Sequence, residues 1–445
     1  MRKLLGLTAT LAAVALAAAG CGGSDDAGSG GSKPGTQASD YGNFAGQNLD
    51  VLGVWSGDEQ KAFQKVLDAF QQKTGAKVNY TSAGDNLPTV LQTRVSGKNP
   101  PNVAFLAQPG LIQQFAKAGN LVPLGPDVVK TMDANMSGEW KNLGSVDGKP
   151  YAVYYKAANK STVWYNATQL EPQGFQAPAT WADMMSTGKA LADAGITPFA
   201  VGGADGWTLT DWFENIYLQT AGPENYDKLA KHEIKWTDPT VKTALQTLQQ
   251  LFGQDTLMAG GHNGALQTDF PTSVTDVFGG KNKAAIVYEG DFVTGNIKDS
   301  TKAVVGKDAK FFPFPTVAPS TKPSVVSGGD AAVAMKDTPA TQALMKFIAS
   351  PEAASIWAKQ GGFLSPNKNV PATDYPDETT KNLAKQLIDA GDNFRFDMSD
   401  QAPTQFGATK GQGEWKDLQD FLANPKDIDG AMKRLEADAA KAYKS

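Results

Sequence analysis

Blocks of apolar and polar residues alternate along the chain in a way that predicts strands followed by helices. The apolar run Leu49–Trp55 predicts a strand, and apolar residues then recur at helical spacing from Phe63 to Phe70. The same pairing returns twice, with strands expected over Ala76–Thr81 and Asn102–Ala107. This alternation predicts an α/β fold, in which a mostly parallel sheet is covered by helices on both faces. In such sheets ligands bind beyond the carboxyl ends of the strands.

The stretch Gly148–Asn166 separates two such α/β units. It contains two short aromatic and β-branched runs, Tyr151–Tyr155 and Thr162–Tyr165, with the polar interval Lys156–Lys160 between them. This pattern predicts a chain that passes from one sheet to another. The stretch would then be a hinge between two lobes, with the ligand in the cleft beside it. An ordinary hairpin within one domain is the alternative interpretation.

A second α/β unit is expected after the hinge stretch. Its first strands are predicted over Ile196–Val201 and Ala284–Tyr288. Two later strands, Phe311–Phe314 and Ala331–Met335, are expected on either side of a glycine-containing loop at Ser327–Asp330. The chain therefore has the elements for two separate α/β units.

The first residues have the composition of a secretory signal. Two basic residues precede the apolar run Leu4–Ala19, and the only cysteine of the chain, Cys21, follows the small residues of a cleavage site. This arrangement resembles the lipobox of bacterial lipoproteins, and it implies a signal peptide over 1–20 and a lipid on Cys21. A plain secretory signal followed by an incidental thiol is the alternative. Residues 21–48 are rich in Gly, Ser and Asp and are expected to form a flexible tether.

Composition argues against several classes of function. The 445-residue chain has a net charge of −5 and no basic block, which argues against a nucleic-acid partner. Its two histidines, His232 and His262, have no second ligand at metal spacing, so no metal or other cofactor is expected. No motif for a serine nucleophile or a phosphate loop occurs. Glu289 and Asp291 follow an apolar strand and could serve glycoside hydrolysis, bind hydroxyl groups, or simply be solvated.

The loops at the expected cleft combine aromatic rings with amides and acids. Flat rings match the C–H faces of a sugar, while carboxylates and amides pair with its hydroxyl groups. The expected ligand-binding residues are Trp55, Ser56, Asp85, Asn86, Gln108, Lys156, Trp207, Asp211, Trp212, Glu289, Asp291, Gly329 and Asp330. In this interpretation the tryptophans stack on sugar rings, Lys156 donates from the hinge, and the acids and amides bind hydroxyl groups. Each residue alone is a weak indication, and Trp212 fits a core position at least as well.

Several motifs carry a family resemblance. They include PPNVAFLAQPG at 100–110, GKPYAV at 148–153, VWYN at 163–166, KNKAAIVYEGDFV at 281–293 and GGDAAV at 328–333. In this order they resemble the extracellular solute-binding proteins of bacterial ABC sugar importers, from Leu49 to the C-terminus. The motifs VWSGDE at 54–59, DGWTLTDWFE at 205–214 and FFPFP at 311–315 are similar to those of the α-glucoside-binding branch.

The resemblance implies a two-lobe, periplasmic-binding-protein-like fold with a hinge and a ligand cleft between the lobes. Lobe 1 would comprise 49–157 and 295–348, and lobe 2 would comprise 158–294 and 349–445. The protein would close around its ligand without chemistry, and its closed form would be recognised by the ABC permease subunits. It would be a monomer held to the outer face of the cell membrane by the lipid on Cys21.

The expected ligand is a carbohydrate, with an α-glucoside di- or oligosaccharide as the first choice. Two other functions stay open at this point. One is a secreted glycoside hydrolase that uses Glu289 and Asp291, and the other is a binding protein for a non-sugar solute such as a peptide or a polyamine.

Overall fold

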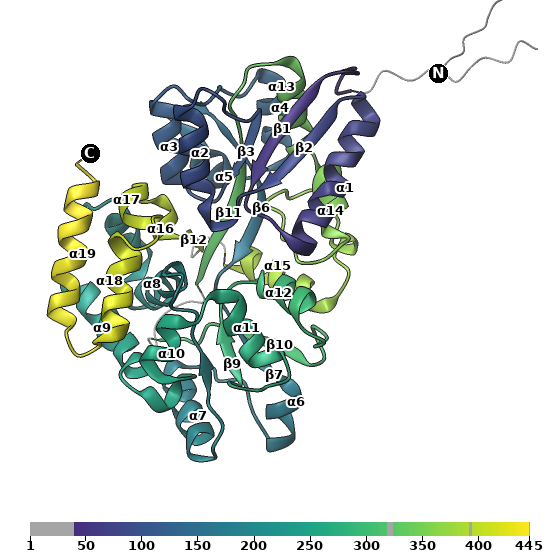
Figure 1. Cartoon of the computed structure of the whole chain (residues 1–445). Helices are drawn as coiled ribbons and strands as arrows, with labels where there is room; N and C mark the ends of the chain where they lie inside the picture. Colours follow the sequence, from purple (N-terminus) through teal and green to yellow (C-terminus); the bar gives the residue numbers. More distant parts are fainter. Residues whose placement is uncertain (1–39, 318–323, 391–393, 445) are drawn as a thin grey trace, which may run out of the picture. The chain divides into compact units, whose positions relative to one another are not determined.

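The computed structural model describes residues 40–317, 324–390 and 394–444, which belong to one compact unit with two main sheets (Figure 1). The expected signal peptide and the lipidation site Cys21 lie outside the described residues. Of Asp85 the structure describes the backbone only. Across these described ranges, no helix is long and apolar enough to cross a bilayer.

The first sheet is six-stranded, in the order β12-β11-β3-β1-β2, with β6 also pairing with β11. Its strands are β1 (Asn48–Gly53), β2 (Lys77–Ser82), β3 (Val103–Leu106), β6 (Ala152–Asn159), β11 (Val325–Ala334) and β12 (Phe394–Phe396). β1 pairs in parallel with β2 and β3, and helices α1 (Gly57–Thr74), α2 (Leu87–Ser96) and α3 (Pro109–Lys117) follow these three strands. The predicted parallel strand–helix alternation is therefore confirmed, although β11 joins the sheet antiparallel to β3 and β6.

Helix α1 begins and ends as its sequence dictates. Asp58 and Glu59 lie in its first turn, where negative charge is favoured by the helix dipole. Gly75 ends it in the left-handed conformation with φ of 73°, which glycine adopts without a Cβ clash. The buried face carries Phe63, which packs edge-on against Trp55 at a ring distance of 4.8 Å. This packing fixes the start of α1 next to the end of β1.

The second sheet is four-stranded, in the order β10-β7-β9-β8. Its strands are β7 (Thr162–Asn166), β8 (Phe199–Ala200), β9 (Ile286–Tyr288) and β10 (Ala309–Pro313). The predicted transit of the chain between sheets is confirmed, because β6 belongs to the first sheet and β7 to the second. The polar interval Lys156–Lys160 is mostly strand, since β6 extends to Asn159.

The remaining elements complete the layers around the two sheets (Figure 1). The helices are α4 (Pro126–Asn135), α5 (Gly138–Leu143), α6 (Ala167–Leu170), α7 (Trp181–Asp193), α8 (Trp207–Ala230), α9 (Pro239–Phe252), α10 (Gly261–Gln267), α11 (Phe270–Phe278), α12 (Val293–Ser300), α13 (Pro339–Ile348), α14 (Pro351–Ala358), α15 (Glu378–Asp389), α16 (Met398–Gln401), α17 (Thr404–Gly407), α18 (Gly413–Ala423) and α19 (Ile428–Ala442). Single turns lie at Gly84–Asn86, Glu171–Gln173, Asp255–Leu257 and Ala372–Asp374, and a small ribbon pairs β4 (Ser145–Val146) with β5 (Lys149–Pro150). α8 is kinked at Gly222, where φ is 81°, just before Pro223.

The expected loop at Ser327–Asp330 is wrong, because these residues lie inside β11. They pair with β6 from Asn159 back to Lys156. Gly329 belongs there because a Cβ on it would lie 2.6 Å from the carbonyl oxygen of Lys156. The glycines thus permit a close strand pair rather than a turn.

The sheets also divide the chain differently from the expected lobe boundaries. The expected lobe 1 segment 295–348 contributes β10 to the second sheet and β11 to the first. The expected lobe 2 segment 349–445 contributes β12 to the first sheet, and its α14 packs on α1. These strands pair with partners that lie far away in sequence. Local composition therefore does not predict which later segments belong to the first sheet.

Candidate functional site

The short connection between β6 and β7 places Lys160 among acids that lie far from it in sequence. Its Nζ lies 3.1 Å from Asp211 Oδ1 on α8 and 2.5 Å from Asp397 Oδ2, with Asp400 Oδ2 at 3.9 Å. The ammonium also lies over the ring of Trp207, 5.7 Å from its centroid. We call these five residues the Lys160 centre. Only 12% of the Lys160 side chain is exposed.

The charges of the Lys160 centre are fixed by mutual contact. Burial alone would lower the pKa of Lys160, but the charges of Asp211 and Asp397 outweigh it and hold this pKa well above its usual value. Burial would raise the pKa of Asp397, but Lys160 lowers it to about 2. Asp397 also accepts hydrogen bonds from Ser399 Oγ at 2.7 Å and from the Asp400 amide at 2.8 Å. The ammonium–carboxylate pair at the centre is therefore fully ionised.

Asp211 and the neighbouring Glu289 hold a proton more tightly than ordinary carboxyl groups do. Burial raises the pKa of Asp211 to about 7 despite the charge of Lys160. Burial and the nearby charge of Asp211 raise the pKa of Glu289 well above its usual value. Glu289 is 1% exposed, and its carboxyl group lies next to that of Asp211. A proton on Glu289 removes the charge repulsion between this carboxyl and Asp211.

A second centre forms around Lys156 on β6. Its ammonium pairs with Glu59 in the first turn of α1 and lies 5.6 Å from the ring centroid of Trp357 on α14. Asp330 is its partner across the strand pair and accepts a hydrogen bond from Trp55 Nε1 at 3.2 Å. We call Lys156, Glu59, Asp330 and Trp357 the Lys156 centre. Charges of Glu59 and Asp330 raise the pKa of Lys156 although burial opposes them.

A β-bulge explains why Lys156 points toward Trp357. The register of β6 against β11 shifts between Asp330 and Ala331, so that Tyr155 has no residue opposite it. Tyr154 packs on Trp140 on one face of the strand, with ring centroids 5.2 Å apart. Tyr155 packs on Trp357 at 6.0 Å, and Lys156 lies over the same ring. Two consecutive side chains thus face α1 and α14, which strict alternation would not allow.

The two centres are electrostatically connected through Asp330. Burial raises the pKa of Asp330 to about 6, while Lys156 and, more weakly, Lys160 act to lower it. The charge of Asp330 is therefore coupled to both ammonium groups, and more strongly to Lys156 than to Lys160.

Hydrogen bonds join the connections between the sheets at the same place. The Asn159 amide donates to Asp291 Oδ1 at 2.6 Å, and the Asp291 amide donates to the Asn159 carbonyl at 3.0 Å. The Val326 amide donates to Ser161 Oγ at 2.9 Å, and the Asp397 amide to the Ser327 carbonyl at 2.7 Å. Four segments far apart in sequence are thus held together beside Lys160.

The structure brings most of the expected site residues into or beside these centres. Lys156 and Asp330 belong to the Lys156 centre, and Trp55 and Gly329 lie beside it. Trp207 and Asp211 belong to the Lys160 centre, and Glu289 lies beside it. Asp291 lies at the joined connections, where its carboxylate binds a backbone amide. Trp207 begins α8 and packs edge-on against Phe270 and Phe292, with ring centroids 5.3 and 5.9 Å away.

Other expected residues lie apart from the two centres. Trp212 is 1% exposed and packs on Tyr288 with ring centroids 4.3 Å apart, in the core of the second sheet. Ser56 and Asn86 are exposed at the starts of α1 and α2, and Gln108 is half-buried at the start of α3. The side chain of Asp85 is outside the described part of the structure.

Sequence reasoning did not single out several residues of the centres, namely Glu59, Lys160, Trp357, Asp397 and Asp400. Lys160 belongs to the interval that the pattern marked as the hinge, four residues after Lys156. Asp397 has the sequence signal of a helix cap, because it precedes the short helix that contains Asp400. No sequence motif around Trp357 predicts a place in the site, and only its aromatic side chain could have suggested one.

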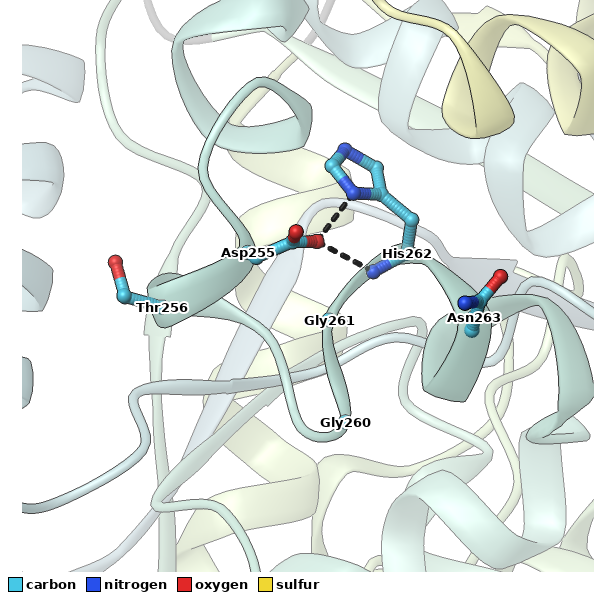
Figure 2. A pocket seen from close by; sticks show the side chains of 6 residues that line it. All are labelled: Asp255, Thr256, Gly260, Gly261, His262 and Asn263. Carbon is cyan, nitrogen blue, oxygen red and sulfur yellow. Dashed lines mark hydrogen bonds and ion pairs between the residues drawn. The ribbon is translucent and has the colours of Figure 1, made fainter.

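A surface pocket of about 370 Å³ lies elsewhere, around Asp255, Gly260 and His262. Figure 2 shows the Asp255 carboxylate between the ring and the backbone amide of His262, and this amide donates to Asp255 Oδ1 at 2.9 Å. The other ring nitrogen, Nε2, lies 2.5 Å from the Phe252 carbonyl. The carboxylate of Asp255 and the ring of His262 are therefore engaged with each other. In the described part of the chain, no group of three or more His, Cys, Asp or Glu side chains could hold a metal ion.

Comparisons with known proteins agree on one family. The family model described as "Bacterial extracellular solute-binding protein" matches residues 55–355. The chain is 32% identical over 402 residues to the alpha-glucosides-binding periplasmic protein AglE of Rhizobium meliloti, covering 87% of this chain and 86% of AglE. It is 32% identical over 381 residues to the osmoprotective compounds-binding protein GgtB of Synechocystis sp., covering 84% and 89%.

A solved structure shares the fold. The bacterial solute receptor AcbH superposes with a TM-score of 0.75 over 89% of this chain and 99% of that one, at 21% sequence identity. The predicted two-lobe, periplasmic-binding-protein-like α/β class is confirmed by this likeness, and so is the resemblance to sugar-binding members of the family.

Proposed function

Because this chain belongs to the bacterial extracellular solute-binding protein family, whose members serve ABC transporters, we propose that it captures a carbohydrate and delivers it to a permease. The first choice of ligand is an α-glucoside di- or oligosaccharide, since AglE carries that ligand class in its name and is similar over most of the chain. Closure at the joined connections beside Lys160 would enclose the ligand and present the form that the permease recognises. No chemistry on the ligand is proposed.

The observation that carries this proposal is the Lys160 centre with its half-buried Trp207. An aromatic ring beside carboxylates and an ammonium group offers the three kinds of contact that a sugar ring uses. Trp207 supplies the flat surface, Asp400 and Asp330 accept from hydroxyl groups, and Lys160 donates. A Lys ammonium has three hydrogens, and Asp211 and Asp397 take two of them, which leaves one for a ligand.

The experiment is a binding titration of the full-length chain with Cys21→Ser, followed by tryptophan fluorescence and calorimetry. The ligands are maltose, trehalose, a β-linked disaccharide and glycine betaine as a non-sugar osmoprotectant. We expect saturable binding of an α-glucoside and none of the β-linked sugar. Binding of glycine betaine alone would replace the carbohydrate by a solute of the kind that the name of GgtB describes.

Trp207→Ala tests the role of the ring in the same assay. We expect affinity for the bound sugar to fall at least tenfold, about 1.4 kcal/mol, because stacking and one wall of the site are lost. The matched control is Trp236→Phe, which alters a buried ring that packs on Phe213 and Phe406. Equal affinities of wild type and Trp207→Ala would remove this residue from the site.

We also propose that Cys21 carries lipid and anchors the protein on the outer side of the cell membrane, with 21–48 as a tether. The supporting features are the apolar segment before Cys21 and the absence of any other cysteine from the sequence. Metabolic labelling with palmitate should mark the wild type and not Cys21→Ser, and the variant should appear in the medium. Equal membrane retention of both proteins would contradict lipidation.

A glycoside hydrolase using Glu289 and Asp291 finds little support in the geometry. Asp291 is 2% exposed and its carboxylate is engaged by the Asn159 amide, so it is not free to face a glycosidic bond. Release of a chromophore from nitrophenyl α-glucoside, lost in Glu289→Gln, would restore that alternative.

A further inference from the structure

Glu214 is a fully buried acid of α8 that the proposed binding site does not include. It is the last residue of the motif DGWTLTDWFE, in which Trp207, Asp211 and Glu214 follow one another at i, i+4 and i+7. In a helix this spacing places the three side chains on one face. Trp207 and Asp211 belong to the Lys160 centre, so Glu214 continues their face about one turn further along α8.

The carboxyl group of Glu214 binds the first turn of α16. Its Oε2 accepts a hydrogen bond from the Met398 amide at 2.7 Å, and its Oε1 accepts one from the Ser399 amide at 2.9 Å. The Tyr226 hydroxyl donates to Oε2 at 2.5 Å. The first amides of a helix have no partner within that helix, so they need an acceptor from elsewhere. Glu214 supplies this acceptor from α8.

α16 carries two acids of the Lys160 centre. Asp397 is its N-cap residue and pairs with Lys160, and Asp400 lies within the helix, 3.9 Å from the same ammonium group. Met398 and Ser399, whose amides Glu214 binds, lie between these two acids in the sequence. A shift of α16 would therefore move both carboxylates relative to Lys160.

The backbone of α16 is closely packed. The helix contacts α8 and α3 (Figure 1). A Cβ on Gly110 of α3 would lie 2.0 Å from the carbonyl oxygen of Ala402, and a Cβ on Gly407 would lie 1.9 Å from that of Ser399. These glycines allow two backbone segments to approach α16 closely. The hydrogen bonds of Glu214 then tie the helix to α8.

Packing alone does not explain an acid at position 214. Burial raises the pKa of Glu214 well above its usual value, the charges of Asp397 and Glu414 add to this rise, and the Tyr226 hydroxyl opposes it. A carboxyl group in such surroundings is unfavourable unless its hydrogen bonds compensate. The two amides of α16 and the hydroxyl provide these bonds.

We propose that Glu214 is a positioning residue for ligand binding, which holds Asp397 and Asp400 toward Lys160 by accepting the amides of α16. It acts through these two acids and not by contact with the sugar. The inference rests on the proposed function, and it adds a residue behind the site on which the affinity depends.

The first test is Glu214→Gln in the full-length chain with Cys21→Ser, titrated by calorimetry with whichever of maltose and trehalose the parent binds more tightly. Glutamine has a single acceptor oxygen, so it accepts one amide of α16 and turns a donor toward the other. We expect the affinity to fall about tenfold. The matched control is Tyr226→Phe, which removes the hydroxyl beside Glu214 and leaves both amide bonds. It should keep the affinity within twofold.

A double-mutant cycle tests whether Glu214 acts through α16. The Asp400→Asn background already lacks one carboxylate that Glu214 positions, so Glu214→Gln should weaken sugar binding less than threefold there. A general loss of structure would instead lower the affinity by the same factor in both backgrounds. Additive losses of this kind would overturn the positioning role.

Hydrogen–deuterium exchange, measured by mass spectrometry, provides a readout without any ligand. Peptides that cover 394–404 should exchange about tenfold faster in Glu214→Gln than in the parent, while peptides from α1 stay unchanged. Unchanged exchange in 394–404, or an affinity within twofold of the parent, would overturn the positioning role and keep the proposed function. Failure of the parent to bind either sugar would overturn the proposed function, and with it the role of Glu214 in binding.

Discussion

Lys156 and Lys160 lie four residues apart, and both are buried against a tryptophan ring, yet their surroundings differ. Lys156 pairs with one carboxylate, Glu59, which is 29% exposed and can be hydrated. Lys160 pairs with Asp211 and Asp397, whose side chains are 0% exposed. The Lys156 centre is built on the first sheet and its helices, whereas the Lys160 centre unites three segments at the connections between the sheets.

This difference separates two roles for a buried ammonium group. Lys160 neutralises carboxylates that water does not reach, so the structure depends on it. Lys156 pairs with Glu59, which water can solvate. Its ammonium group can therefore bind a ligand with a smaller loss of folding stability. Removal of a charge from a buried pair is expensive because it leaves the other charge unpaired.

The largest effect is expected for Lys160→Met. This change leaves Asp397 and Asp211 without their cation, and we expect the free energy of unfolding to fall by about 3–5 kcal/mol. Urea denaturation followed by circular dichroism measures this change. A loss below about 1 kcal/mol would mean that the acids take up protons instead, and the pH dependence of the variant would then reveal that uptake.

A smaller loss, of about 2 kcal/mol, is expected for Lys156→Met, because the remaining Glu59 carboxylate is partly hydrated. Ligand affinity should nevertheless fall, since the ammonium group would no longer donate. The double change Lys156→Met with Glu59→Gln should recover most of the stability and none of the affinity. If Lys156→Met costs as much as Lys160→Met, the two centres do not differ as the geometry indicates.

The smallest effect is expected for Asp330→Asn, and it depends on pH. Burial raises the pKa of Asp330 from 3.8 to about 6 in the folded protein. The folded state therefore binds a proton more tightly than the unfolded state, and this residue makes the free energy of unfolding decrease as the pH rises from about 4 to 6. Asparagine keeps an acceptor for Trp55 Nε1 and removes this part of the slope.

The expected size of that change is about 1.4 kcal/mol, the equivalent of one pKa unit, because partial solvation discounts the rest. Urea denaturation at pH 4, 5, 6 and 7 gives the slope for both proteins. Parallel slopes in wild type and Asp330→Asn would show that another acid, such as Asp211, determines the dependence. Asp397→Asn would produce the opposite sign, since a pKa of about 2 stabilises the fold above pH 3.8 and loses this stability at lower pH.

Much of the fold follows from local pattern. The strand–helix periodicity predicted β1 to β3 with their helices, and the two aromatic runs around the hinge predicted the change of sheet. The local pattern did not predict the strands whose pairing partners lie far away in sequence. Gly328 and Gly329 have the composition of a turn, and only the partner strand β6 makes them part of β11. Likewise nothing in β10 or β12 indicates which sheet each will join.

The site was predictable as a region but not as a set of contacts. Lys156, Asp330 and Trp207 came from their places near strand ends and in a glycine-rich loop. Trp212 illustrates the limit, because a tryptophan five residues after Trp207 on the same helix lies in the core. Asp397 and Asp400 are separated from Lys160 by more than 230 residues in sequence, and only the folded chain shows that they meet.

The bulge at Tyr155 means that β6 carries one residue more than its pairing with β11 uses. Tyr154 faces Trp140, whereas Tyr155 and Lys156 both lie on the side of Trp357. Deletion of Tyr155 would therefore leave a regular strand pair, with Lys156 still opposite Asp330 and on the same face. Homologues and engineered variants that lack this one residue should keep the position of Lys156 and lose the Tyr155 ring that packs on Trp357.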